Sequence, residues 1–154
     1  MISRCTGLIS INLSNFDTSH VTNMGYMFSG CTKLNSLNLD NFDTSNVDKM
    51  NYMFNGCSSL ESIDLSKFNT TLINSIKGMF NGCSKLISLD LSNFKAPQLN
   101  DTSNLFYGCT KLMYLNLSNF DTSQVKNFSG MFYRCLALYS LDISNLNIHL
   151  IVKI

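Results

Sequence analysis

The 154-residue chain contains no tryptophan, a single proline and only two histidines, His20 and His149. Charged residues make up 14% of it, and the formal net charge is +1 without any acidic or basic block. Nucleic acids and anionic lipids are bound by concentrated positive charge, so we expect no nucleic-acid partner. No window reaches the run of about 20 apolar residues that a membrane-spanning helix requires. We therefore also expect no membrane insertion.

Catalytic and metal-binding constellations are missing as well. The two histidines lie far apart, and no pair of cysteines has the C-x-x-C spacing of a zinc site. No Ser/His/Asp set, glycine-rich phosphate loop or pair of acids can be assembled from the sequence. We predict that the chain is not an enzyme and that it carries no cofactor and no metal.

What the sequence does contain is a repeat. Its six cysteines are spaced 26 residues apart along the whole chain. A fixed spacing of this size indicates a solenoid built from one stacked unit. Hydrophobic residues make up 45% of the sequence, which is enough for a packed core. The cysteines that mark the register are Cys5, Cys31, Cys57, Cys83, Cys109 and Cys135.

Aligned on cysteine, the sequence divides into five complete units and one partial unit, which we interpret as a single solenoid over residues 1–154. The second unit, CTKLNSLNLDNFDTSNVDKMNYMFNG, serves as the template. Its Leu-x-x-Leu-x-Leu stretch alternates with period two around Asn38, which predicts a short strand with one buried face. The units are residues 5–30, 31–56, 57–82, 83–108, 109–134 and the partial unit 135–154.

The second half of the unit changes period and predicts a helix. Asp43 and its Thr-Ser followers supply oxygens for an N-cap, and Gly56 suits the left-handed residue after a helix. In the fourth unit, Pro97 falls where we expect the first helical turn, which tolerates proline. We therefore predict an α/β solenoid, with a parallel strand ladder on one face and short helices or helical turns on the other. The helical apolar face is Val47, Met50, Met53 and Phe54.

These patterns resemble a known repeat family. The motif LSNFDTS-x-V-x-x-M-x-x-M-F-x-G-C, preceded by L-x-x-L-x-L, is similar to the 26-residue variety of BspA-like leucine-rich repeats in bacterial and mycoplasma surface proteins. The resemblance runs from Cys5 to about Ile151. It implies a leucine-rich-repeat fold and a role in adhesion or protein–protein contact. It also implies a location at the cell surface or outside the cell.

The chain ends suggest a piece of a longer array. The first residues, MISRCTGLIS, lack the features of a signal peptide. The first unit begins at Cys5, and the last unit stops after HLIVKI without the polar cap that solenoids carry. We therefore interpret the chain as a fragment whose uncapped ends favour end-to-end self-association.

The cysteines allow three interpretations. On stacked strands their Cα atoms would lie about 4.8 Å apart, which is within disulfide range. Their Cβ vectors would run parallel into the core, however, and this favours buried free thiols that act as small apolar fillers. A metal-binding or catalytic role is the third alternative. We favour a structural cysteine ladder.

The outward strand positions form the candidate binding surface. They suit either a solvated polar face or a protein-binding surface. Asp64 and Asp90 are expected to be neighbours, and their like charges would favour either a shifted pKa or a bound cation; a calcium site here is the alternative to the predicted absence of a metal. Tyr114 breaks a row of serines, and tyrosine is enriched in binding hot spots. The candidate binding residues are Asn12, Asn38, Asp64, Asp90, Tyr114, Asn116 and Asp142.

Two functions compete. The favoured one is a non-catalytic protein-interaction or adhesion module of a surface protein, with a protein partner. The alternative is a passive structural spacer, or a truncated repeat fragment without a ligand of its own. A second polar row, which holds Asn41 and Asn93 and is interrupted by Lys67, is expected to satisfy backbone groups where the strand bends away.

Overall fold

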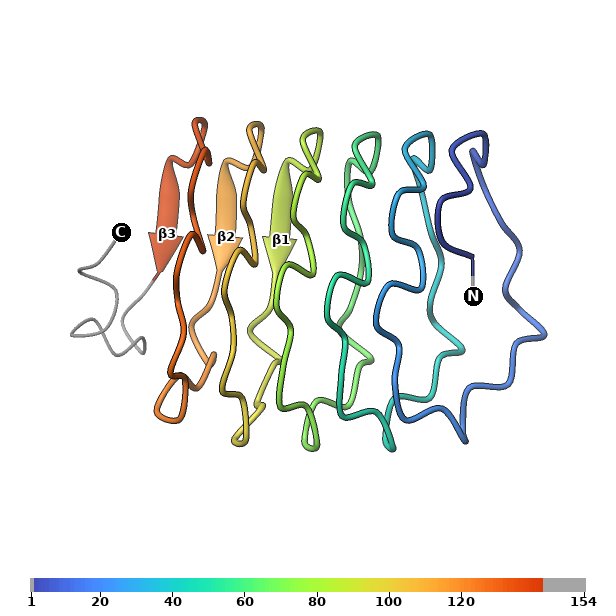
Figure 1. Cartoon of the computed structure of the whole chain (residues 1–154), viewed down its shortest axis with the longest axis horizontal. Helices are drawn as coiled ribbons and strands as arrows, with labels where there is room; N and C mark the ends of the chain where they lie inside the picture. The colour runs from blue at the N-terminus through green and yellow to red at the C-terminus, as the bar shows by residue number, and fades with distance from the viewer. Residues whose placement is uncertain (1, 143–154) are drawn as a thin grey trace.

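The chain winds into coils that lie side by side from its N-terminal to its C-terminal end (Figure 1). This arrangement is that of a computed structural model, which describes residues 2–142. Each coil advances by one repeat, because backbone pairing joins residues 26 positions apart, such as Leu89 and Leu115. The described residues form no helix, and therefore none that is long and apolar enough to cross a membrane.

Three short strands form one parallel sheet. Strand β1 comprises Ser88–Asp90, β2 comprises Tyr114–Asn116 and β3 comprises Ser140–Asp142. The strands follow one another across the sheet in chain order. Leu115 pairs with Leu89 on one side and with Leu141 on the other, so one repeat position forms each rung. The parallel ladder predicted from the Leu-x-x-Leu-x-Leu stretch is confirmed for these units.

The first three units lack the predicted strands. Single backbone bonds join their corresponding segments, such as the 3.3 Å bond from the Asn35 N–H to the Ile9 carbonyl. Their inward residues are only half-buried, whereas Leu89 of β1 is buried. Leu141 of β3 is half-buried too, so burial of the inward residue does not by itself decide which segments pair. The prediction of a strand in every unit is wrong. The half-buried inward residues of the first three units are Ile11, Leu37 and Ile63.

A ladder of turns replaces the predicted helix in the second half of each unit. The Phe54 N–H donates to the Met79 carbonyl of the next unit at 2.9 Å. The Met53 N–H instead closes a turn on the Met50 carbonyl of its own unit at 3.3 Å. An α-helix would keep all of these bonds within one segment, so the helix prediction is wrong. Isolated parallel bridges join Asn23, Lys49, Ser75, Asp101 and Asn127 in succession.

Left-handed residues within each unit prevent the helix. Tyr52 has a φ of 56°, inside the segment predicted to be helical, and Gly56 has a φ of 70°. A left-handed residue breaks the run of right-handed dihedral angles that an α-helix needs. The left-handed glycine predicted at Gly56 is present. The burial predicted for the helical face also holds, since these side chains are fully buried: Val47, Met50, Met53 and Phe54.

Turns occupy the two segments where the sequence predicted the start of a helix. Asp43 does not cap a helix, because none follows; its Oδ1 accepts the Ser45 N–H at 2.9 Å within a local turn. In the fourth unit, the Leu99 N–H bonds to the Ala96 carbonyl at 3.0 Å. Pro97 takes the second position of that turn, which suits its fixed φ. The proline is therefore accommodated by a β-turn and not by a helical turn.

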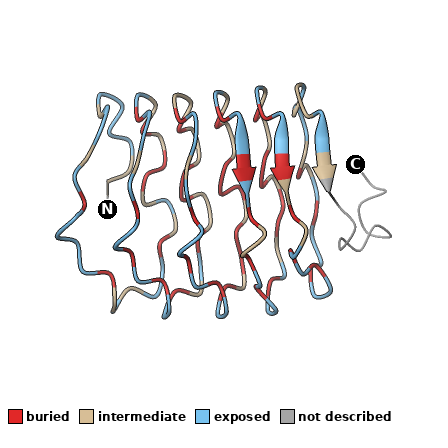
Figure 2. Ribbon diagram, turned by 180° about the vertical axis from the view of Figure 1, so that it is seen from behind, coloured by how far each residue is buried: buried red, intermediate tan, exposed pale blue. Residues whose placement is uncertain are grey.

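A column of phenylalanine rings runs through the core. Consecutive rings are nearly parallel, with centroids between 5.6 and 5.9 Å apart. Buried positions recur at the same places in successive coils (Figure 2). Each coil therefore completes the packing of its neighbour, and the outward face of the strands is held on a continuous core. The rings belong to Phe28, Phe54, Phe80, Phe106 and Phe132.

Gly78→Ala is expected to lower the free energy of unfolding by about 2–3 kcal/mol. Gly78 has a φ of 57°, and an added Cβ would overlap the ring of Tyr52. That ring stacks on Tyr26 with centroids 5.0 Å apart, so its displacement adds to the backbone strain. Urea denaturation measures the loss. In a Tyr52→Ala background only the backbone strain should remain, and an equal loss in both backgrounds would contradict the overlap.

Candidate functional site

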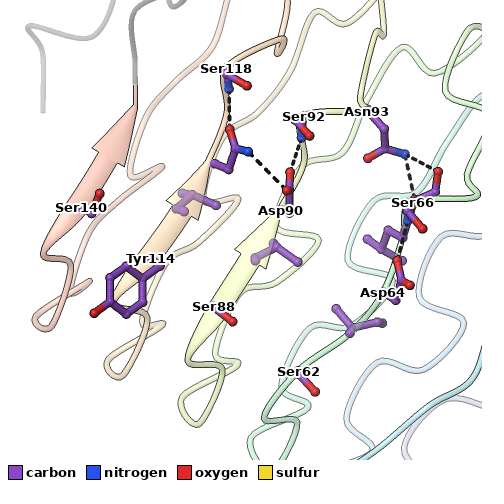
Figure 3. A pocket seen from close by; sticks show the side chains of 15 residues that line it. Ser62, Asp64, Ser66, Ser88, Asp90, Ser92, Asn93, Tyr114, Ser118 and Ser140 are labelled. Atoms are coloured by element: carbon purple, nitrogen blue, oxygen red, sulfur yellow. Dashed lines mark hydrogen bonds between the residues drawn. The ribbon is translucent and has the colours of Figure 1, made fainter.

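The outward face of the strands is a shallow groove of about 910 Å³ (Figure 3). Serine hydroxyls line one side of it, and aspartate or asparagine side chains line the other. Tyr114 stands on β2 and is 53% exposed. The groove brings together four of the predicted binding residues: Asp64, Asp90, Tyr114 and Asn116. Asn12 and Asn38 line a separate, smaller hollow, and the side chain of Asp142 lies outside the described residues.

The aspartate and asparagine side chains at the outward strand position of Asp64, Asp90 and Asn116 bond to the backbone two residues further along the chain. The Oδ1 atom of Asp64 accepts the Ser66 N–H at 2.8 Å, and that of Asp90 accepts the Ser92 N–H at 2.8 Å. Such turns are a local use of these residues and fix the bend after the strand. One oxygen of each side chain is therefore engaged in structure. Asn12, Asn38 and Asn116 make the same bond.

Hydrogen bonding lowers the pKa values of both groove aspartates. The Ser66 backbone N–H is the main cause for Asp64, and bonding to Ser92 is the main cause for Asp90. Asn116 also donates its Nδ2 hydrogen to Asp90 Oδ2 at 3.2 Å. A like-charge effect between neighbouring carboxylates would raise these pKa values, so the shifts that are present come from hydrogen bonding instead. Both carboxylates are ionised at neutral pH.

The described residues on this face do not form a cluster of metal ligands. Between residues 2 and 142, no three His, Cys, Asp or Glu side chains gather closely enough to hold an ion. Calcium takes six to eight oxygen ligands. The row of the groove supplies two carboxylates, each with one oxygen bonded to the backbone.

The second polar row links neighbouring coils. Asn41 Nδ2 donates to the Leu13 carbonyl at 2.9 Å, and Asn93 Nδ2 donates to the Leu65 carbonyl at 2.9 Å. These bonds satisfy backbone carbonyls just beyond the strand segments, as the sequence predicts. Lys67 replaces asparagine at the corresponding position of the third unit and forms an exposed ion pair with Asp40 at 3.1 Å.

The cysteine thiols point at backbone carbonyls, not at one another. Cys57 Sγ, for example, donates to the Phe28 carbonyl at 3.2 Å. All six cysteines are free; Cys5 is exposed and Cys135 is half-buried. Burial raises the pKa of Cys57 to about 12, so the thiol keeps its proton at neutral pH. The buried members of the ladder are Cys31, Cys57, Cys83 and Cys109.

The structure brings one Ser/His/Asp trio together in the first unit. The Ser19 hydroxyl lies 3.0 Å from His20 Nδ1 and donates to Asp17 Oδ1 at 2.7 Å. In a catalytic triad the acid orients the imidazole, whereas here it binds the hydroxyl itself. The three side chains are also exposed or only half-buried on a turn. The trio therefore lacks the arrangement that activates a serine nucleophile.

An exposed apolar row borders the groove, and sequence analysis missed it. The Met113 N–H donates to the Ile87 carbonyl at 2.8 Å, and the Tyr139 N–H donates to the Met113 carbonyl at 3.1 Å. The three side chains therefore follow one another on adjacent coils, and Tyr139 is 87% exposed. The equivalent position holds Ile9, Asn35 and Glu61 in the earlier units. Three successive apolar residues at this position, after the polar Asn35 and Glu61, are the signal that identifies the row.

A family model described as "Mycoplasma protein of unknown function, DUF285" matches residues 1–113 and 87–154. This match confirms the resemblance to mycoplasma repeat proteins that the motif predicts. No curated protein is significantly similar to the chain.

Three solved structures are similar to the chain. A leucine-rich cell surface protein from Faecalibacterium prausnitzii is 19% identical with a TM-score of 0.47; the match covers 74% of this chain and 34% of that protein. A leucine-rich repeat protein of T. pallidum is 25% identical with a TM-score of 0.48; the match covers 89% and 68%. A leucine-rich repeat protein from Bacteroides ovatus is 22% identical with a TM-score of 0.38; the match covers 88% and 49%. The chain thus spans about a third of the first structure and half of the third.

Proposed function

Because the chain belongs to the family described as "Mycoplasma protein of unknown function, DUF285", we propose that it is a non-catalytic protein-interaction module that binds a partner protein on its strand face. The observation that carries this proposal is Tyr114, a half-exposed aromatic side chain on a groove whose other exposed side chains are small and polar. Tyrosine supplies a large contact area and is enriched among binding hot spots.

The proposal extends to adhesion at the cell surface, within a longer array of which residues 1–154 are one solenoid piece. The first described coil supports a longer array. Phe16 is 46% exposed there, whereas Phe42 at the same repeat position is 4% exposed. A further coil, supplied by a longer chain or by a second copy, would cover Phe16 as each described coil covers its neighbour.

The alternative function is a passive spacer. It is favoured by the local turns of Asn12, Asn38 and their equivalents, because these turns occupy polar groups that a ligand would otherwise contact. A spacer has no use for an aromatic side chain on the groove, however. Tyr114 therefore supports the interaction module over the spacer.

Selection of binders from a random peptide display library tests the proposal. Tyr114→Ser restores the residue that other units carry, as at Ser88 and Ser140, so the fold should be kept. Selected peptides should bind this variant about tenfold more weakly than the original chain. The control is Tyr26→Asn, which changes a half-exposed tyrosine of the turn ladder to the residue found at the equivalent Asn104. Peptides that bind all three proteins equally would favour the spacer.

A further inference from the structure

The apolar row and the aspartates lie in two parallel lines along the groove. Ile87 precedes β1 and Asp90 ends it, and neighbouring coils repeat this arrangement with Met113 and Asn116 around β2. Three residues of extended chain separate the two lines by roughly 10 Å. Tyr114 on β2 comes one residue after Met113 and two residues before Asn116. A ligand that lies along the sheet therefore meets apolar side chains on one edge, in the coils of Ile87, Met113 and Tyr139, and carboxylates on the other edge, in the coils of Asp64 and Asp90.

The charges across the face are arranged in a fixed order. Neither lysine nor arginine is among the residues that line the groove. Lys67, which follows the groove residue Ser66, is paired with Asp40 at 3.1 Å. Two exposed lysines, Lys85 and Lys111, lie two residues before the apolar positions, on the side away from the aspartates. In the coil of β1, Lys85, Ile87 and Asp90 thus follow one another along the chain, and in the next coil the neutral Asn116 takes the place of the carboxylate.

We propose that this face binds a cationic amphipathic segment of the partner protein, which lies across the strands and runs from coil to coil. Its apolar side chains would pack on Ile87, Met113 and Tyr139, and its lysine or arginine side chains would face Asp64 and Asp90. The inference rests on the proposed function and adds the chemical class of the partner. Charge complementarity favours a positively charged partner segment and fixes its orientation. Lys85 and Lys111 would repel its cationic edge if that edge lay on their side of the apolar row instead of beside the aspartates.

The test uses two amphipathic peptides of equal length, one of leucine and lysine and one of leucine and glutamate. Fluorescence anisotropy with the full chain measures their affinities at low and high salt. The Leu/Lys peptide should bind more tightly, and added salt should weaken it. Met113→Asn introduces the residue type that Asn35 provides at the same repeat position. It should weaken binding of the Leu/Lys peptide at both salt concentrations.

The decisive variant is Asp64→Asn/Asp90→Asn. Asparagine occupies this row at Asn12, Asn38 and Asn116 and makes the same turn, so the change removes charge without removing the turn. It should weaken Leu/Lys binding about tenfold. The control is Asp48→Asn/Asp101→Asn on the turn ladder, where asparagine also occurs at the equivalent positions. This control should leave the affinity unchanged.

The outcomes separate this inference from the proposed function. Equal weakening by the two double variants, or tighter binding of the Leu/Glu peptide, would overturn the inference. Library peptides that depend on Tyr114 but carry neutral or acidic side chains would also overturn it, while leaving the proposed interaction module in place. Loss of the Tyr114 dependence would overturn both.

Discussion

Phe80→Ala is expected to lower the free energy of unfolding by about 3–5 kcal/mol. The Phe80 side chain is fully buried and stacks on Phe54 and Phe106, with ring centroids 5.6 and 5.9 Å away. Its removal leaves a cavity in the middle of the ring column and deletes both aromatic contacts. Because whole domains are stable by about 5–15 kcal/mol, the loss is a large share of the total. Urea unfolding followed by far-UV circular dichroism measures it.

The control for this prediction is Phe16→Ala. Phe16 lies on the first described coil and is 46% exposed, so its truncation removes few contacts. We expect a loss of about 1 kcal/mol or less. If Phe80→Ala costs no more than Phe16→Ala, the stacked column does not hold adjacent coils together.

The sequence pattern predicted which residues are buried better than it predicted the secondary structure that they form. The spacing of Val47, Met50 and Phe54 identifies residues that are fully buried, although they belong to turns and not to a helix. Burial depends on which side chains are apolar, whereas helix formation also depends on each backbone dihedral angle. Tyr52 gives no sign of its left-handed conformation by itself. Its equivalents include Gly78 and Asn104, residue types that adopt this conformation readily, and this row is the signal available in the sequence.

The sequence predicted only part of the candidate site, and the reason is related. Alignment to one template emphasises what the units share, and the shared aspartate and asparagine row has a structural use in turns. Tyr114 was recognised because it departs from a uniform serine row. The row of Ile87 and Met113 was missed because the same repeat position holds both apolar and polar residues, beginning with Ile9 and continuing with Asn35 and Glu61, so the common motif does not show it. In a repeat protein, recognition surfaces arise where units differ, so comparison between units locates them better than the common motif.

Raising the pH above about 9 is expected to destabilise the fold steeply, because buried thiols resist ionisation. Burial raises the pKa values of Cys57, Cys83 and Cys109, that of Cys57 to about 12. Unfolded thiols lose their protons near pH 8.5. Above that pH the unfolded chain binds fewer protons than the folded one, so the free energy of unfolding falls. Three thiols together contribute a slope of about 4 kcal/mol per pH unit, up to roughly pH 12.

Cys57→Ser/Cys83→Ser isolates this effect, because every other side chain is the same in the variant and in the original protein. A serine hydroxyl can still donate to the Phe28 and Phe54 carbonyls that accept from these thiols. Urea unfolding between pH 9 and 11 should give a slope shallower by about 2.7 kcal/mol per pH unit, whatever the stability at neutral pH. Replacement of the exposed Cys5 by serine should leave the slope unchanged. Equal slopes in all three proteins would mean that water reaches the thiols, which contradicts their burial beside the phenylalanine column.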